Sequence, residues 1–564
     1  MRALDWVVLC GWLAFIVTYG VWKGRRSRSL QGYVLGDRSM RWYMVAFSVM
    51  ATQASAITFL STPGQAYADG MRFVQFYFGL PIAMVVLSVT AIPFYRRLKV
   101  YTAYEFLERR FDAKVRTLAA SLFLVQRGLA CGLTIFAPSL ILSVLLGWNM
   151  QATIFVIGTL VIIYTASGGT KAVSYTHFLQ LMILMAGIFT ALAFAVARLP
   201  EGVSFGDAVF VAGKTGRLNA IDLTFDWKNR YNIWSGLIGG FFLALSYFGT
   251  DQSQVGRYLT GQSVTQSRLG LLFNGLAKVP MQFIILFTGA MVFVFYQFQA
   301  PPVYFNPVET RRVAASAGAA EFDELSRAYE RAADARAVEA MNLVAARRDG
   351  DGHAGERAAA SLAAADAETR ATREKAIEVV KSANPRSDGR DVNYVFLTFI
   401  LANLPAGLIG LTLASVFAAS MSSTSSELNA LASTSIVDVY RRFVRKEASD
   451  RHYVVASKAA TVVWGAFAIA FAQSANKLGS LVEAVNILGS LFYGTILGIF
   501  LLAFYLRRVG GTAVFLGALV GEVAVIFCFT STGISFLWYN VVGCLGTMAA
   551  ALAVAPFMRR RVAA

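Results

Sequence analysis

The sequence has little of what soluble enzymes and disulfide-rich proteins use. Its 564 residues include only four cysteines and three histidines, and only 15% of them are charged. Cys10, Cys131, Cys528 and Cys544 lie in apolar runs without a CxxC pair, so we expect neither a disulfide framework nor a metal site from them. No nucleophile–base arrangement and no metal-ligand pair stand out along the chain, which argues against an enzyme.

The sequence is instead rich in long runs of apolar residues. Hydrophobic residues make up 56% of the chain, above the roughly 45–50% of soluble globular proteins. We predict an all-α integral membrane protein, embedded in the lipid bilayer of the cell (inner or plasma) membrane, with about 13 spans of the length that a bilayer requires. The predicted spans start near residues 5, 41, 73, 116, 151, 176, 232, 271, 403, 453, 479, 511 and 534.

The net charge of +18 alone would suggest a nucleic-acid partner, but the placement of the basic residues argues against one. They gather at the ends of apolar runs, as the positive-inside rule describes. Only Arg2 precedes the first run, so we expect the N-terminus outside. No small-residue cleavage site follows that run, so we expect no removed signal peptide. An odd number of spans then puts the C-terminus inside. The basic residues assigned to the inside lie at 23–28, 96–99, 171, 257, 441–442, 445–446, 507–508 and 559–561.

A hydrophilic segment separates the apolar runs into two groups. Residues 301–392 are rich in Ala, Glu and Arg and fall outside in the predicted topology. We predict two helices divided at the turn-rich residues 349–355, which form a solvated hairpin outside the membrane core. A partner-binding role for them stays open. The chain is thus divided into residues 1–300 with spans 1–8, the insert 301–392, and residues 393–564 with spans 9–13.

Two predicted spans are unusually polar. Residues 417–440 hold nine Ser or Thr residues, which can either pack helices closely or offer oxygen ligands to a hard cation such as Na⁺. Residues 50–67 mix Gln, Ser and Thr into an apolar run. A helix break near residues 51–55 would free backbone carbonyls for a cation. The alternative is a straight helix with a polar packing face.

Ionisable and amide side chains at membrane depth are costly and are therefore candidates for function. Arg127 is either the partner of an anionic substrate group or part of an internal ion pair. Lys278 is either a substrate donor or an internal counter-charge. For Asp251 we favour a structural or gating role, and Glu483 and Asn486 could line a cavity.

Taken in order, these pieces resemble the sodium/solute symporter family, which includes carriers of proline, galactose, iodide, monocarboxylates and vitamins. The resemblance covers the chain outside the 301–392 insert, and only the combination of its motifs is specific. It implies a LeuT-like core of two inverted five-helix repeats, formed by spans 2–6 and 7–11. The motifs are ATQASAITFLSTPGQAY at 51–67, YTAYEFLERRF at 101–111, GGTKAVSYTHFLQ at 168–180, YFGTDQSQVGR at 247–257, and the Ser-rich stretch 422–440.

The resemblance also implies site residues. Sodium would bind the backbone carbonyls of Ala51, Ala54 and Ala419 and the hydroxyls of Ser422 and Ser423. The solute would bind alongside, near Gln53, Ser55, Tyr247, Lys278 and Asn486, with Arg127 as the candidate partner of a carboxylate.

One position departs from the family pattern. His177 stands where the family signature has Asp, a residue that helps sodium leave or contributes to a further ion site. Histidine cannot replace a carboxylate as a ligand of a hard cation, and it titrates near neutrality. We therefore expect no second sodium site from this position. His177 is either a structural replacement or a coupling group for protons.

These observations predict a sodium-coupled secondary active symporter that imports a small organic solute by alternating access, with Na⁺ as the co-transported ion. Arg127 favours a carboxylate solute, and a sugar fits as well. The alternatives are a proton-coupled carrier of the same fold and a sensor or receptor derived from one. The sequence does not decide the solute, the sodium stoichiometry or the oligomeric state, although it is compatible with a monomer.

Overall fold

The structure is a computed structural model that describes residues 2–24, 32, 35, 38–98, 100–385, 387, 389–475 and 480–558, without the side chains of 20–21, 23–24 and 167–175. Within these residues the chain is helical and forms no strand, and a single bridge pairs Met40 with Gly261. Of the basic residues predicted to lie inside, those at 25–28, 99 and 559–561 lie outside the described residues, and the side chains of those at 23 and 171 are not described.

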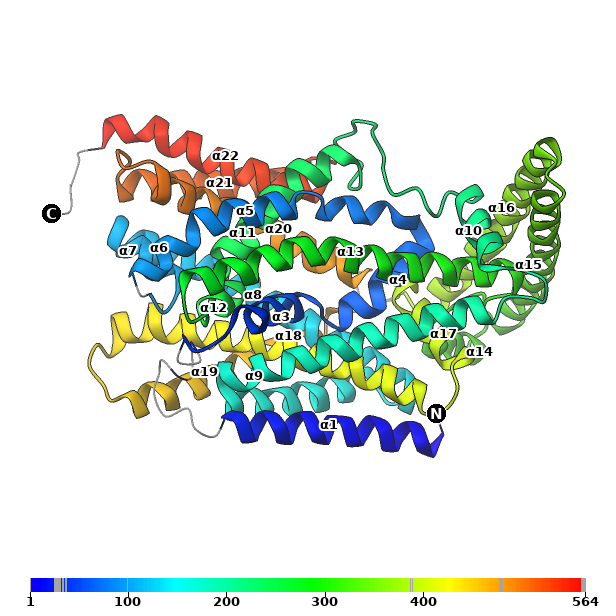
Figure 1. Ribbon diagram of the computed structural model, residues 1–564, viewed down its shortest axis with the longest axis horizontal. Coiled ribbons are helices and arrows are strands. Elements are labelled where there is room, and N and C mark those ends of the chain that lie inside the picture. Colours follow the sequence, from blue (N-terminus) through cyan, green and yellow to red (C-terminus); the bar gives the residue numbers. More distant parts are fainter. Residues whose placement is uncertain are drawn as a thin grey trace.

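Long helices run side by side along the longest axis of the molecule (Figure 1). The N-terminus and the helices of the insert lie toward the same end of this bundle, and the last long helix, Phe536–Val554, runs toward the opposite end. The elements in chain order are α1 (Ala3–Gly24), α3 (Trp42–Gln53), α4 (Ala56–Asp69), η2 (Gly70–Tyr77), α5 (Leu80–Val89), α6 (Ala91–Leu98), α7 (Ala103–Arg110), α8 (Ala113–Leu146), α9 (Met150–Ala197), α10 (Phe205–Lys214), η3 (Ser235–Gly239), α11 (Gly240–Thr250), α12 (Gln252–Tyr258), α13 (Val264–Phe298), α14 (Pro307–Ala314), α15 (Ala319–Arg348), α16 (Gly352–Ala383), α17 (Val392–Asn403), α18 (Leu408–Thr434), η4 (Ser435–Val444), α19 (Asp450–Ala472), α20 (Leu481–Tyr505), α21 (Gly511–Ser531), α22 (Phe536–Val554) and η6 (Ala555–Phe557).

Nine stretches of the described chain are long and apolar enough to cross a membrane. Their apolar side chains include exposed ones at the periphery, such as Val523 and Phe527 on α21, as a lipid-facing surface requires. The number of crossings and their orientation stay predictions. The nine are Ala56–Leu98, Ala113–Leu146, Thr176–Ala197, Val264–Phe298, Leu408–Val444, Asp450–Ala472, Leu481–Tyr505, Gly511–Ser531 and Phe536–Phe557, and shorter apolar helices are Ala3–Tyr19, Met150–Ala166, Ser235–Thr250 and Val392–Asn403.

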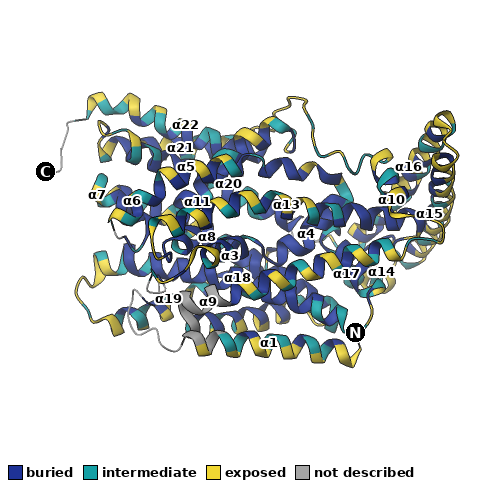
Figure 2. Ribbon diagram, viewed as in Figure 1, coloured by how far each residue is buried: buried dark blue, intermediate teal, exposed yellow. Residues whose placement is uncertain are grey.

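The Ser-rich helix α18 lies at the centre of the bundle. It packs against α1, α8, α9 and α19, and almost all of its residues are buried, whereas exposed residues gather on the outer helices (Figure 2). Its hydroxyls bond inward: Ser420 Oγ donates to the carbonyl of Thr134 at 2.9 Å, and Thr424 Oγ1 to Thr134 Oγ1 at 3.1 Å. Small hydroxylated side chains let neighbouring backbones approach and satisfy their own polar atoms within the helix seam.

Helix α4 is held closely on two sides by glycines. A Cβ added to Gly64 would lie 2.1 Å from the carbonyl oxygen of Val392 at the start of α17, and one on Gly289 of α13 would lie 2.2 Å from the carbonyl oxygen of Pro63. Because no side chain fits these gaps, glycine fixes the distance of α4 from α13 and α17.

The insert contains the two helices that the sequence predicts. α15 ends at Arg348 and α16 begins at Gly352, and the two helices pack along each other. Arg336 connects this hairpin to the bundle, because its NH2 donates to the carbonyl of Tyr296 on α13 at 2.6 Å. Asp207 on α10 contacts Arg347 at 3.1 Å and Arg348 at 2.6 Å. Burial of its carboxyl raises the pKa of Asp207. Hydrogen bonds from Ser204 and Arg348 outweigh this effect and lower the pKa to about 2.

Candidate functional site

Two helices are interrupted near the middle of the bundle. α3 ends at Gln53 and α4 begins at Ala56, so the break predicted near residues 51–55 is present at Ala54 and Ser55. Ser55 Oγ caps α4 by accepting a hydrogen bond from the amide of Ile57 at 3.2 Å. Interrupted helices leave backbone carbonyls and amides without partners in the helix, which makes them available to ions and ligands.

The second interruption lies between α11 and α12, at Asp251. Its Oδ1 accepts hydrogen bonds from the amide and the hydroxyl of Ser253, at 2.8 and 2.6 Å, and thereby caps α12. This carboxylate therefore stabilises a helix start inside the bundle.

The broken helix α3 meets α18 at the residues predicted to bind sodium. Ser423 Oγ donates to the carbonyl of Ala51 at 3.4 Å, and Thr52 Oγ1 donates to Ser426 Oγ at the same distance. Ser422 Oγ is buried and has no hydrogen-bond partner among the described residues. Ala54 and Ala419 are buried on the same two segments. The structure thus brings together the two segments that carry all five predicted sodium ligands.

A cavity of about 100 Å³ lies beside this contact. Gln53, Ser55, Arg127, Tyr247 and Asn486, all predicted to bind solute, line it together with Ser423. A volume of this size holds several waters or a small solute. The remaining lining residues are Thr52, Ile57, Thr58, Phe76, Tyr77, Thr134, Leu243, Glu427, Val482, Val485 and Tyr493.

Lys278 is the one predicted solute-binding residue that does not line the cavity. It is fully buried on α13, and its Nζ lies 5.7 Å from the ring centre of Tyr77, which does line the cavity. Lys278 therefore lies near the cavity wall at Tyr77 without being part of it.

Arg127 is held by acids of the protein itself. Its NH1 donates to Glu427 Oε1 at 2.9 Å, and its NH2 bonds Asp251 Oδ2 and, at 2.6 Å, the hydroxyl of Tyr493. These contacts join α8, α18, α20 and the break at Asp251. Of the two alternatives for Arg127, the internal ion pair is the one that the geometry contains.

His177 lies between α3 and α18 and outside the cavity lining. Its Nδ1 is 3.0 Å from Ser48 Oγ, and its Nε2 is 3.5 Å from Ser426 Oγ. The ring therefore bridges the two helices of the candidate sodium site through hydroxyl groups.

Two further polar networks connect helix ends. Glu483, at the start of α20, contacts Arg230 NH1 at 2.5 Å and accepts a hydrogen bond from the hydroxyl of Tyr231 at 3.1 Å. Near the start of α8, Arg116 contacts Glu108 and Asp438, each at 2.7 Å. Burial raises the pKa of Glu108, but hydrogen bonds from Arg116 and Arg442 outweigh this effect and lower that pKa below its ordinary value.

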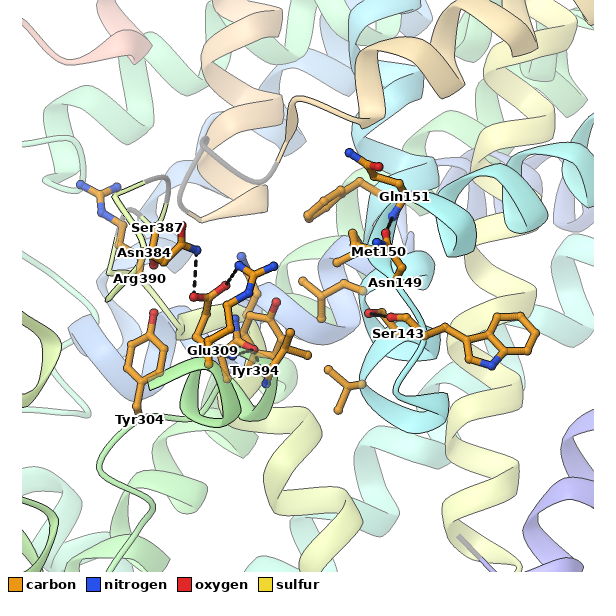
Figure 3. Close-up of a pocket in the computed structure, with 18 of the residues that line it drawn as sticks. Ser143, Asn149, Met150, Gln151, Tyr304, Glu309, Asn384, Ser387, Arg390 and Tyr394 are labelled. Carbon is orange, nitrogen blue, oxygen red and sulfur yellow. Dashed lines mark hydrogen bonds and ion pairs between the residues drawn. The ribbon is translucent and has the colours of Figure 1, made fainter. Parts of the chain in front are cut away.

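A larger pocket of about 870 Å³ lies where the insert meets the α8–α9 turn, and it shares no residue with the central cavity. Figure 3 shows Glu309, Asn384 and Tyr394 on one side and Ser143, Asn149 and Gln151 on the other. Glu309 accepts hydrogen bonds from Arg312 at 3.0 Å and from Asn384 at 2.9 Å. No predicted site residue lines this pocket.

Sequence reasoning did not single out Glu427 or Tyr493, although both line the cavity and contact Arg127. A signal for Glu427 was present, since it is an acid within a predicted span, where each ionisable residue is a functional candidate. Nothing in the local sequence marks Tyr493.

The chain resembles known transporters over most of its length. A model of the sodium:solute symporter family matches residues 33–322 and 376–521 and leaves most of α15 and α16 unmatched. The sodium/iodide cotransporter of Homo sapiens is 30% identical over 299 residues, which are 52% of this chain and 46% of the human protein. The chain therefore matches about half the length of that relative.

Other relatives match almost end to end. The sodium/sialic acid symporter SiaT of Proteus mirabilis is 24% identical over 98% of this chain and 95% of its own. A solved structure of a Na⁺-coupled sialic acid symporter in a substrate-bound outward-open state has a TM-score of 0.74 at 22% identity and covers 99% of this chain. This likeness establishes the LeuT-like helical fold. The relatives are transporters, not enzymes, and this chain is a multi-pass membrane protein. It belongs to the sodium:solute symporter family.

Proposed function

We propose that the protein is a sodium-coupled symporter that moves a small organic solute by alternating access. The observation that carries this proposal is the position of Ser423, which lines the central cavity and also contacts the broken helix α3. A cation at this contact and a solute in the cavity would be neighbours. Coupling requires only that both ligands favour the same conformation, and the membrane potential adds about 2.3 kcal/mol per charge per 100 mV.

The proposed sodium ligands are the carbonyls of Ala51, Ala54 and Ala419 and the hydroxyls of Ser422 and Ser423. All five residues are buried, and all five groups are oxygen donors, as a hard cation prefers. The hydroxyl of Ser422, which has no partner among the described residues, supports the proposal because a buried polar atom without a bond is costly.

The proposed solute site is the central cavity, with Gln53, Ser55, Tyr247 and Asn486 as hydrogen-bonding groups, Arg127 in its wall and Lys278 near Tyr77. The expected preference for a carboxylate depended on Arg127. Both terminal nitrogens of Arg127 already bond protein groups, and Nε has no partner among the described residues, so a carboxylate solute would share the guanidinium with Glu427 and Asp251.

We also propose that residues 301–392 form a unit outside the core that residues 1–300 and 393–564 make up. This division is supported by a separate small hydrophobic cluster around Val313, Phe322, Tyr329 and Val380 within the insert.

The test is a thermal-unfolding screen of the purified protein with carboxylates, sugars, amino acids and amines, each in NaCl and in KCl. A ligand that binds the native state raises the unfolding midpoint by mass action. We expect a solute whose stabilising effect needs Na⁺. Stabilisation that ignores Na⁺ and follows pH would contradict the proposal and favour proton coupling through His177.

A further inference from the structure

The buried ion cluster around Arg127 has more negative than positive charge. Asp251 and Glu427 both contact this one guanidinium. Their exposed fractions are 1% and 5%, and that of Arg127 is 3%. Among the described residues no other basic side chain pairs with either acid. A buried charge without an opposite charge is costly, so with both acids ionised the cluster has one negative charge to compensate.

The hydrogen bonds locate the unused accepting capacity on Glu427. A carboxylate has about four lone-pair positions. Asp251 uses two on Oδ1 for Ser253, and two on Oδ2 for Arg127 and for the hydroxyl of Tyr493 at 3.1 Å. Glu427 accepts one bond per oxygen, from Arg127 and from Thr134 Oγ1, each at 2.9 Å, and the thiol of Cys131 is a further hydrogen-bond partner of its carboxylate. Asp251 is therefore saturated, whereas Glu427 can accept about one more bond.

Glu427 also lines the central cavity, whereas Asp251 does not. The same cavity is lined by four aromatic rings, those of Phe76, Tyr77, Tyr247 and Tyr493. Aromatic faces attract cations, and the attraction grows where water is excluded. Four aromatic rings and a carboxylate that can accept a further hydrogen bond thus line the same cavity.

We propose that the solute carries a positively charged ammonium group and that Glu427 is its ion-pair partner. This proposal rests on the proposed function and narrows the class of its solute. An ammonium group compensates the excess charge, donates to the unused lone-pair position of Glu427 and packs against the rings. A carboxylate solute would meet an arginine whose NH1 and NH2 are already bonded, beside an uncompensated acid.

The experiment compares three probes of one shape but different charge. These are choline, its uncharged carbon analogue 3,3-dimethylbutan-1-ol, and the anion 3,3-dimethylbutanoate, with methylamine and ethanolamine as smaller ammonium solutes. Thermal unfolding of the full-length protein is followed in NaCl and in KCl. We expect an ammonium probe to raise the unfolding midpoint in NaCl, and the alcohol and the carboxylate to leave it unchanged.

Variants then test the role of Glu427. Glu427→Gln should raise the half-saturating concentration of that ammonium probe roughly tenfold or more, the usual effect of losing a charged hydrogen-bond partner. Glu427→Asp, which keeps the charge, should retain most of the response. The matched control is Glu522→Gln, which removes a partly buried carboxylate on α21 outside the cavity.

The proposal would be wrong if no ammonium probe raised the unfolding midpoint of a protein that responds to NaCl. It would also be wrong if the uncharged analogue stabilised the protein equally, or if Glu427→Gln left the response to the ammonium probe unchanged. A variant that alters the response to NaCl but not to the amine would assign Glu427 to sodium instead. If the ammonium probe acts equally in KCl, the sodium coupling fails while the solute class stands.

Discussion

Ser423 on α18 donates a hydrogen bond to the backbone carbonyl of Ala51, two residues before α3 ends. The two residues are far apart in the chain, and their contact joins an interrupted helix to the Ser-rich helix at the wall of the central cavity.

Substitution of Ser423 by Ala should weaken the sodium response of the protein roughly tenfold, because one of the five proposed oxygen ligands is lost. The half-saturating Na⁺ concentration in thermal unfolding measures this. Ser433→Ala is the matched control, since Ser433 is a buried serine of the same helix that only bonds the carbonyl of Ala430. An unchanged half-saturating concentration in Ser423→Ala would count heavily against the site.

Substitution of Arg127 by Gln should strongly destabilise the protein, because Asp251 and Glu427 would remain buried without a counter-charge. Breaking a buried pair by removing one partner costs about 3–5 kcal/mol. The midpoint of thermal unfolding reports the change. The double variant Arg127→Gln with Asp251→Asn should recover part of the loss, since it buries one charge fewer. Equal stability of the single and double variants would contradict this account of the cluster.

Gly289→Ala should destabilise the contact between α13 and α4 by about 1–3 kcal/mol, the usual cost of overpacking. The added Cβ would meet the carbonyl oxygen of Pro63 at 2.2 Å, and a backbone atom cannot turn away as a side chain can. Gly213→Ala on α10 is the control, because a Cβ there has no neighbour within 4 Å. Thermal unfolding of the two variants side by side decides the point, and equal midpoints would refute the prediction.

The ion pairs of Asp207 with Arg347 and Arg348 should stabilise the docked insert over most of the pH range. The pKa of Asp207 is lowered from 3.8 to about 2, so its contribution is complete above the unfolded-state pKa and is lost as the pH falls through the folded one. The difference in unfolding midpoint between the protein and Asp207→Asn should therefore be constant from pH 7 to about 4 and shrink below that. If the difference in unfolding midpoint grew on acidification, the prediction would be wrong.

The sequence predicted those features that depend on local pattern. The interruption at Ala54 and Ser55 followed from polar residues within an apolar run, and the insert hairpin followed from helical composition on both sides of residues 349–355. Both are present because neighbouring residues decide them. Five of the six proposed solute-binding residues share one cavity, which agrees with the family resemblance, although their roles stay predictions.

Pairing over long distances could not be predicted in the same way. Arg127 meets Asp251 and Glu427 across 124 and 300 residues, and no local pattern encodes such a contact. The sequence also does not say which face of a buried helix meets a cavity. Lys278 and Tyr77 illustrate this: both are deep in the bundle, but only Tyr77 borders the central cavity. These contacts depend on how the helices pack in three dimensions.

The hairpin of α15 and α16 has a practical consequence for imaging. It lies at one end of the bundle (Figure 1) and is fixed to it through Arg336 and through Asp207 with two arginines. Membrane carriers of this size present few landmarks outside a detergent micelle. A hairpin attached in this way, outside the membrane as we propose, would give each particle in electron cryomicroscopy an asymmetric mark for alignment, without an antibody fragment.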